Sequence, residues 1–177
     1  MDKKIYGVEG IIIIDNCIVL GMQKEKRWYK NEKLGAVIKT IGGKIEKEDD
    51  GDPLNALKRE MLEEICGISN ENFEIKEKPL FNIETSMNDI NSFEHNSDLT
   101  LNANFYLISI KKEADLTPND LPFIFKIPIK KLLELDFNRT IDFNLVSEFS
   151  VGDYDNKPKE VCLMVPLEVK EILFNYE

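Results

Sequence analysis

A glycine turn followed by a well-marked helix is the feature that most constrains the fold of this chain. Gly42 and Gly43 end a β-branched stretch, and two glycines at a strand end indicate a positive-φ turn or a close approach of another segment. A helix is expected to begin at Asp52 and Pro53, with Asp52 as the N-cap, and to end at Gly67. This stretch therefore predicts a strand, a loop and a helix in direct succession.

The predicted helix has two distinct faces. At about 100° per residue, its apolar positions fall on one side and should face the core; they are Leu54, Leu57, Met61 and Ile65. Glu60, Glu63 and Glu64 fall on another side, in the half of the helix where the macrodipole disfavours negative charge. A bound cation would reverse these penalties, and several carboxylates suit Mg²⁺ or Mn²⁺. The simpler alternative is a solvated acidic face.

Composition limits the partners that the chain can take. Its 177 residues suggest one domain, and its formal net charge of −10 argues against a nucleic-acid backbone or an anionic membrane as partner. A small anionic substrate stays compatible, because bound Mg²⁺ reverses the local sign. The three cysteines are widely spaced, which argues against a zinc site and favours a reduced, cytoplasmic protein. No segment reaches the roughly 20 apolar residues needed to span a bilayer.

The rest of the chain reads mainly as strands. A hairpin is expected around Asp15 and Asn16, and the continuous run Ile11–Ile14 should be covered on both faces. Further strands are expected at 35–41, 73–83, 99–110, 123–129 and 160–165, with helices at 130–135 and 166–176.

Two polar stretches are expected to be loops. Residues 23–33 hold Lys24, Lys26 and Arg27, which could contact phosphates, and Trp28 and Tyr29, which could stack on a base. Residues 84–98 hold the only histidine, His95. A solvated surface loop is the simpler interpretation of both stretches.

The segment 42–68 resembles the Nudix box. The family pattern runs Gly, five residues, Glu, seven residues, then Arg-Glu, an aliphatic residue, any residue, Glu-Glu, any residue and Gly. Arg59-Glu60-Met61-Leu62-Glu63-Glu64 matches its helical core, and Gly42-Gly43-Lys44-Ile45-Glu46 looks like its loop.

The match departs from the family pattern in four places. Gly43 and Arg59 are 59 − 43 = 16 steps apart, two more than in the pattern, and Cys66 is one extra residue before Gly67. Ile41 replaces the usual Pro, and the usual Trp is absent. The insertion leaves the loop acid open among Glu46, Glu48, Asp49 and Asp50.

The resemblance implies a fold and an activity. The fold would be α/β (α+β), a Nudix-type α/β/α sandwich with a mixed β-sheet, formed by residues 1–177 as one domain. The activity would be Mg²⁺- or Mn²⁺-dependent hydrolysis of the diphosphate linkage in a nucleoside triphosphate, a nucleotide sugar, ADP-ribose or a similar nucleotide. Dimers are common in the family, so the resemblance allows a homodimer.

The resemblance also assigns roles to residues. The metal ligands would be Glu60, Glu63, Glu64 and the carbonyl of Gly42, and Arg59 would orient the glutamates. The general base stays open between Asp120, Glu113 and Glu63, and the phosphate contacts would come from Lys44, Arg27 and Lys39. Two alternatives are a catalytically weak or inactive Nudix-like domain that binds a nucleotide or a protein partner, and an acidic interaction protein without a site.

Overall fold

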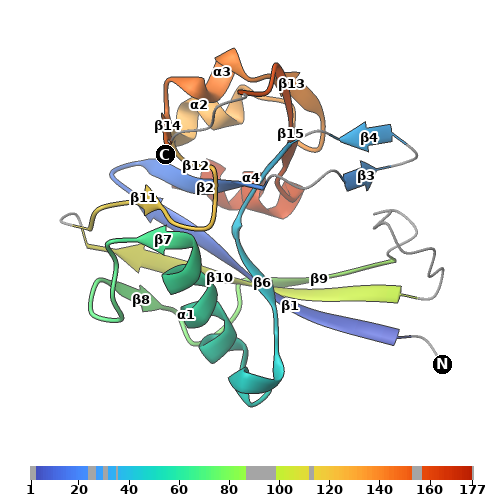
Figure 1. Ribbon diagram of the computed structural model, residues 1–177, viewed down its shortest axis with the longest axis vertical. Coiled ribbons are helices and arrows are strands. Elements are labelled where there is room, and N and C mark those ends of the chain that lie inside the picture. Colours follow the sequence, from blue (N-terminus) through green and yellow to red (C-terminus); the bar gives the residue numbers. More distant parts are fainter. Residues whose placement is uncertain are drawn as a thin grey trace.

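A mixed β-sheet runs through the computed structural model, which describes residues 3–23, 27–29, 32–34, 36–86, 99–111, 114–152 and 157–176 (Figure 1). Eleven of the described strands belong to it. They are β1 (Lys3–Ile14), β2 (Cys17–Gln23), β5 (Val37–Lys39), β6 (Ile41–Lys44), β8 (Phe73–Ile75), β9 (Phe81–Ser86), β10 (Leu99–Ile110), β12 (Phe123–Pro128), β13 (Thr140–Asp142), β14 (Ser150–Val151) and β15 (Glu160–Met164). The pairs β1–β10 and β15–β5 are parallel, and the others are antiparallel.

Strand β1 is the axis of this sheet. It pairs with β10 along one edge, and along the other edge with β6 through Gly7–Gly10 and with β2 through Ile12–Ile14. Asp15 and Asn16, both at positive φ (51° and 58°), make the tight turn into β2, which confirms the predicted hairpin. Ile11 and Ile12 are fully buried on opposite faces, so the predicted two-sided burial of this run is also confirmed.

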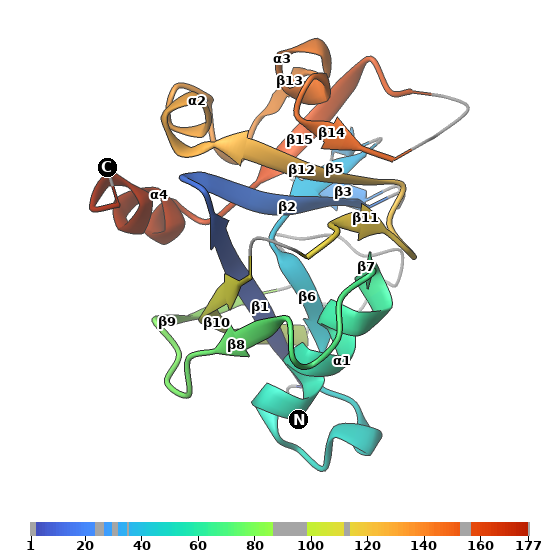
Figure 2. The same cartoon turned by 90° about the vertical axis from the view of Figure 1, so that its left-hand side faces the viewer.

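Helices cover the two faces of the sheet. On one face α1 (Pro53–Glu64) packs through Ala56, Leu57 and Met61. On the other face lie α2 (Ile129–Leu133), α3 (Asn144–Ser147) and α4 (Leu167–Phe174), which contribute apolar side chains to a second buried cluster. Figure 2 shows α1 set apart from α2, α3 and α4. The predicted three-layer arrangement is therefore confirmed. No helix among the described residues is long and apolar enough to cross a membrane.

Two expected strands are each divided into two. The stretch 35–41 breaks at Thr40, because β5 pairs with β2 and β15 whereas β6 turns away to pair with β1. The stretch 73–83 breaks into β8 and β9 around Pro79, whose nitrogen cannot donate to a ladder. The strand at 99–110 and the helices near 130 and 167 form as expected.

The helix α1 ends earlier than predicted. Its last residue is Glu64, and Ile65 and Cys66 form a short strand, β7, which pairs with β11 (Thr117–Pro118). Gly67 follows at a φ of 80°, so it turns the chain after β7 rather than after the helix. The extra residue of the box is thus used in a strand pair that ties the end of α1 to the segment before Asp120.

The polar stretch 23–33 is not wholly a loop. Its backbone contains the antiparallel pair β3 (Arg27–Tyr29) and β4 (Glu32–Leu34). Lys24 and Lys26 lie outside the described residues, as do His95 and Glu113, and the side chains of residues 27–29 are not described either.

Candidate functional site

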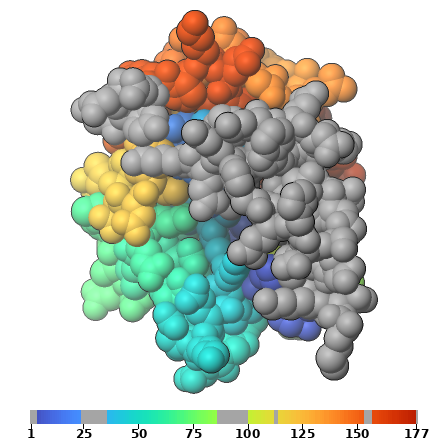
Figure 3. Space-filling view, turned by 45° about the vertical axis from the view of Figure 1, so that its right-hand side comes forward, coloured from blue at the N-terminus to red at the C-terminus, as the bar shows by residue number. Residues whose placement is uncertain are grey.

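The loop between β6 and α1 and the acidic face of α1 adjoin on one side of the molecule. On the face shown in Figure 3, the atoms of the loop meet those of α1 at the lower end of the structure. The loop holds a short 3-10 helix, η1 (Lys47–Asp49), before α1 begins. The predicted N-cap is confirmed, because the Asp52 side chain accepts a hydrogen bond of 2.8 Å from the Leu54 N–H.

Close neighbours leave no room for a side chain at Gly42 or Gly43. Gly42 has a φ of 155°, and a Cβ there would run into the Val8 carbonyl of the neighbouring strand. A Cβ on Gly43 would overlap the carboxylate of Glu60. The glycine turn therefore lets the Glu60 side chain lie directly against the loop backbone.

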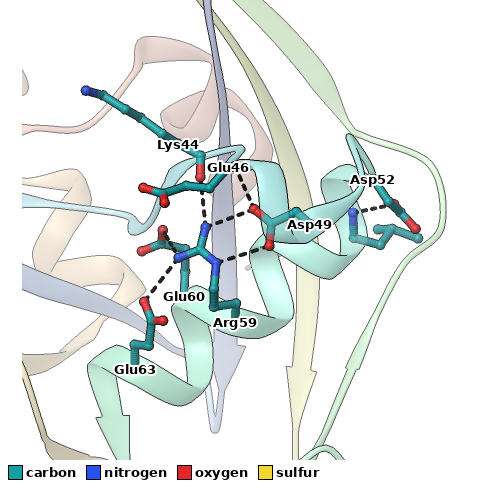
Figure 4. Close-up of polar contacts among 8 residues, drawn as sticks. Lys44, Glu46, Asp49, Asp52, Arg59, Glu60 and Glu63 are labelled. Carbon is teal, nitrogen blue, oxygen red and sulfur yellow. Dashed lines mark hydrogen bonds and ion pairs between the residues drawn. The ribbon is translucent and has the colours of Figure 1, made fainter.

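Arg59 joins the loop to the helix. Its Nε and Nη2 donate to the two carboxylate oxygens of Asp49 at 3.1 and 3.0 Å, and Nη2 also donates to the Lys44 carbonyl at 2.9 Å. Its Nη1 donates to Glu60 Oε1 at 2.8 Å and to Glu63 Oε2 at 3.1 Å. Figure 4 shows the guanidinium between Asp49 on one side and the two glutamates on the other. The arginine thus holds both glutamates in fixed directions.

Of the four acidic residues that could be the loop acid, Asp49 is the one that contacts Arg59. Its side chain is only 3% exposed, and it also accepts a 2.7 Å hydrogen bond from the Glu46 N–H. The hydrogen bonds from Arg59 hold the pKa of the Asp49 carboxyl below its usual value. Five residues separate it from Gly43, as in the family pattern, so the two extra residues lie between Asp49 and Arg59. Asp50 and Gly51, both at positive φ, absorb them in a tight turn.

Glu60 and Glu64 are both partly buried on α1, and Glu60 is ion-paired with Arg59. Burial raises the pKa of Glu60, although Arg59 acts in the opposite direction. Burial raises the pKa of Glu64 to about 7, and the nearby carboxylates of Glu60, Glu9 and Asp120 add to the effect, while Lys39 opposes it. Two partly buried carboxylates with raised pKa values on one helix face form an environment that attracts a cation.

Lys39 supplies a positive charge close to Glu60 and Glu64. Its Nζ donates to Glu9 Oε1 and to the Gly42 carbonyl, both at 2.9 Å. Glu9 also accepts a 2.8 Å hydrogen bond from the buried hydroxyl of Thr40. The lysine and Glu9 side chains are 14% and 17% exposed, so this ion pair is largely shielded from water.

Asp120 is brought to the end of α1 by its neighbour. The Asn119 N–H donates to the Glu64 carbonyl at 3.0 Å, and its side-chain amide donates to the Glu63 carbonyl at 2.9 Å. These bonds satisfy carbonyls that the helix end leaves open. Asp120 is thereby held within electrostatic reach of Glu64.

The structure brings only some of the predicted site residues into contact with one another. Among the residues that the structure describes, no three His, Cys, Asp or Glu side chains converge closely enough to hold a metal ion. Glu63 is half exposed and is directed toward Arg59. The Lys44 side chain points away from Arg59, although its carbonyl takes part in the network (Figure 4).

Sequence reasoning missed Glu9 and Thr40 as members of the site. Glu9 interrupts an otherwise apolar, β-branched run, and an acidic residue inside such a strand is the signal that could have identified it. Its register partner in β6 is Gly42, which places it beside the glycine turn. Thr40 gives no signal of its own, because its role depends on the break between β5 and β6.

The backbone of this chain resembles solved structures of other proteins. No protein-family model and no curated protein matches the sequence. Among solved structures, the dihydroneopterin triphosphate pyrophosphohydrolase of E. coli is similar over 73% of this chain and 84% of its own, with a TM-score of 0.51 and 11% identity. The NUDIX domain of Shewanella oneidensis NrtR, complexed with ADP ribose, is similar over 77% and 80%, with a TM-score of 0.50 and 13% identity.

At these identities the likeness concerns the backbone and not the chemistry. The shared arrangement is a mixed sheet between helices. This chain therefore has the Nudix fold.

Proposed function

We propose that this protein is a metal-dependent hydrolase of the diphosphate linkage in a nucleotide derivative. The observation that carries the proposal is the pair of partly buried carboxylates, Glu60 and Glu64, with raised pKa values beside the glycine turn. Even partial burial makes a charged carboxylate costly unless a cation neutralises it. Helix physics alone does not explain this placement, whereas a metal site does.

The residues present fit Mg²⁺ or Mn²⁺ in chemical type. Glu60, Glu63 and Glu64 offer carboxylate oxygens and Gly42 offers a carbonyl, which are the donors that hard cations take. The contacts with Arg59 use one oxygen of Glu60 and one of Glu63. When bound, such an ion would polarise the phosphoryl oxygens and lower the pKa of an attached water.

The remaining roles fall to the side chains of this chain. Arg59 would hold Glu60 and Glu63 in position and would itself be fixed by Asp49. Asp120, held near Glu64 by its neighbour Asn119, is the first candidate to accept the proton of the attacking water. Lys44, with an exposed side chain, is suited to a phosphate contact.

A second function is favoured by one observation. The Gly42 carbonyl, a proposed metal ligand, accepts a hydrogen bond from Lys39 in this structure. A domain in which the lysine stays there could bind a nucleotide without turning it over. The Shewanella domain, solved with ADP ribose, makes that compound a suitable test ligand.

A substrate panel distinguishes the two functions. The purified protein would be incubated with Mg²⁺ or Mn²⁺ and nucleoside triphosphates, ADP-ribose, nucleotide sugars, dinucleoside polyphosphates or a pterin triphosphate. Release of a monophosphate or of pyrophosphate from at least one compound is expected. Metal-dependent binding of a nucleotide without any product would favour the second function.

Substitutions on α1 test the site itself. Glu63→Gln and Glu64→Gln should each lower kcat by at least about 100-fold, because each removes a proposed ligand of the metal that would stabilise charge on the reacting phosphate. Glu74→Gln, on the exposed surface of β8, is the matched control and should retain wild-type turnover. Unchanged turnover in both α1 variants would rule out the proposed site.

The expected cytoplasmic location and the single-domain organisation stay predictions.

A further inference from the structure

The Lys39 ammonium lies where the proposed metal site meets the sheet. It donates to the Gly42 carbonyl and to Glu9, each at 2.9 Å, and its charge acts on both Glu60 and Glu64. Glu9 is itself held by the buried Thr40 hydroxyl. A cation, with its own counter-ion, therefore lies beside the acidic face of α1.

We propose that Lys39 acts as a resident cation that competes with the metal ion, so that it sets the metal affinity of the site. This inference rests on the proposed function, because it presupposes that the α1 carboxylates bind a metal. It assigns Lys39 a positioning role on the Gly42 carbonyl in place of the phosphate contact expected from the sequence.

Two features of the contact support competition. The first is that the Gly42 carbonyl is shared: it is a proposed metal ligand, and it already accepts a 2.9 Å hydrogen bond from Lys39 Nζ. A metal ion bound to this carbonyl would therefore lie close to the lysine ammonium. Two positive charges in a partly buried place repel each other strongly. The ammonium must therefore move away, or the metal must bind more weakly.

The second feature is that the lysine is held and not free to swing. Its side chain is 14% exposed, and Glu9 lies on a strand paired along both edges. Glu9 also gains a hydrogen bond from Thr40, so the pair is fixed to the sheet from two sides. Moving the ammonium would break a shielded ion pair, and that cost lowers the apparent metal affinity.

Mn²⁺ binding provides a test that does not need a substrate. Wild type, Lys39→Met and Lys39→Arg would be titrated with Mn²⁺ by calorimetry after treatment with a chelator, and their thermal unfolding would be followed with and without Mn²⁺. Lys39→Met should bind Mn²⁺ about tenfold more tightly, because removing the ammonium frees the carbonyl and leaves the Glu9 charge to attract the ion. It should also show a lower Tm without metal and a larger rise in Tm with it. Lys39→Arg, which keeps the charge, should stay close to wild type.

Two further proteins make the result decisive. Lys126→Met removes a partly exposed lysine that pairs with Asp15 at 3.2 Å, and it should leave the Mn²⁺ affinity unchanged. The double variant Glu9→Gln/Lys39→Met removes both charges of the pair, so it should fold even where Lys39→Met alone does not, and it should still bind Mn²⁺ more tightly than wild type.

The outcomes separate this inference from the proposed function. If wild type binds Mn²⁺ and the variants lacking Lys39 bind it equally or more weakly, the competition is refuted while the metal site stands. If no protein in the set binds Mn²⁺, the metal site and the inference both fail. Binding by the variants alone would support the inference in its strongest form.

Discussion

Replacing Asp49 by asparagine should loosen the whole link between the loop and the helix. The carboxylate is 3% exposed and takes two hydrogen bonds from Arg59, at 3.0 and 3.1 Å, and one from the Glu46 N–H. Removing one partner of a buried ion pair costs about 3–5 kcal/mol. Arg59 keeps Glu60, Glu63 and the Lys44 carbonyl and is 20% exposed, so we expect a smaller loss of about 2–3 kcal/mol in the free energy of unfolding.

Urea unfolding of wild type and Asp49→Asn at pH 7 measures this loss. Asp50→Asn is the matched control, because Asp50 is exposed and lies in a left-handed conformation that asparagine tolerates. The control should change the free energy of unfolding by less than about 0.5 kcal/mol. A loss in Asp49→Asn no larger than in the control would refute the role given to Asp49.

The same variant has a defined dependence on pH. Arg59 lowers the pKa of Asp49 in the folded state below the ordinary value of 3.8, so the folded state favours the ionised carboxylate. The stability that this group adds is present above pH 3.8 and is lost as the pH falls through the lower folded-state pKa. The difference between wild type and Asp49→Asn should therefore be constant near neutral pH and should narrow in acid. A difference that grows as the pH falls below 3.8 would contradict this assignment.

Three further substitutions test other parts of the site. Without metal at pH 8, Glu64→Gln should raise the free energy of unfolding by about 1–2 kcal/mol in urea titrations, because burial raises the pKa of Glu64 to about 7 and the charged form is costly; a loss of stability would contradict this. Gly43→Ala should weaken Mn²⁺ binding and lower the Tm, because its Cβ would meet the Glu60 carboxylate, whereas Gly51→Asn, at a positive φ in open space, should do neither. Asp120→Asn should lower kcat by about 100-fold or more with little change in Tm, and unchanged kcat would exclude Asp120 as the base.

Local sequence signals predicted much of the fold. The hairpin at Asp15 and Asn16 and the helix start at Asp52 depend on a few adjacent residues, and both form as expected. The burial of Ile11 and Ile12 on opposite faces follows from the continuous apolar run. Such signals suffice where the conformation is decided within a few residues of the chain.

The departures come from contacts between distant segments. No residue near Glu64 in the sequence predicts that Ile65 and Cys66 pair with residues 117–118. This pairing ends the helix early. The break at Thr40 likewise depends on which strands lie beside β5 and β6. Tertiary pairing overrides the local preference in both cases.

The site residues also fall into those that local sequence identifies and those that only spatial contacts identify. The helix glutamates and Arg59 were identified from their order in the chain, and the structure joins Arg59 to Glu60 and Glu63. Asp49 stayed one of four alternatives, because only burial and the bidentate contact single it out. Glu9 escaped notice because its neighbours in space lie about 30 residues away, as the separation of 30 from Lys39 shows.

The double pairing of β1 has a consequence for how the site can open. Around Glu9 the strand is bonded to β10 on one edge and to β6 on the other, so its amides alternate between two ladders and none of them lies on a free edge. We expect hydrogen exchange in this part of β1 to be among the slowest in the protein. Local fluctuations of the loop that follows β6 would then move the carboxylates of α1, while Glu9 stays in place on β1. We therefore expect the distance between Glu9 and these carboxylates to change when the site rearranges.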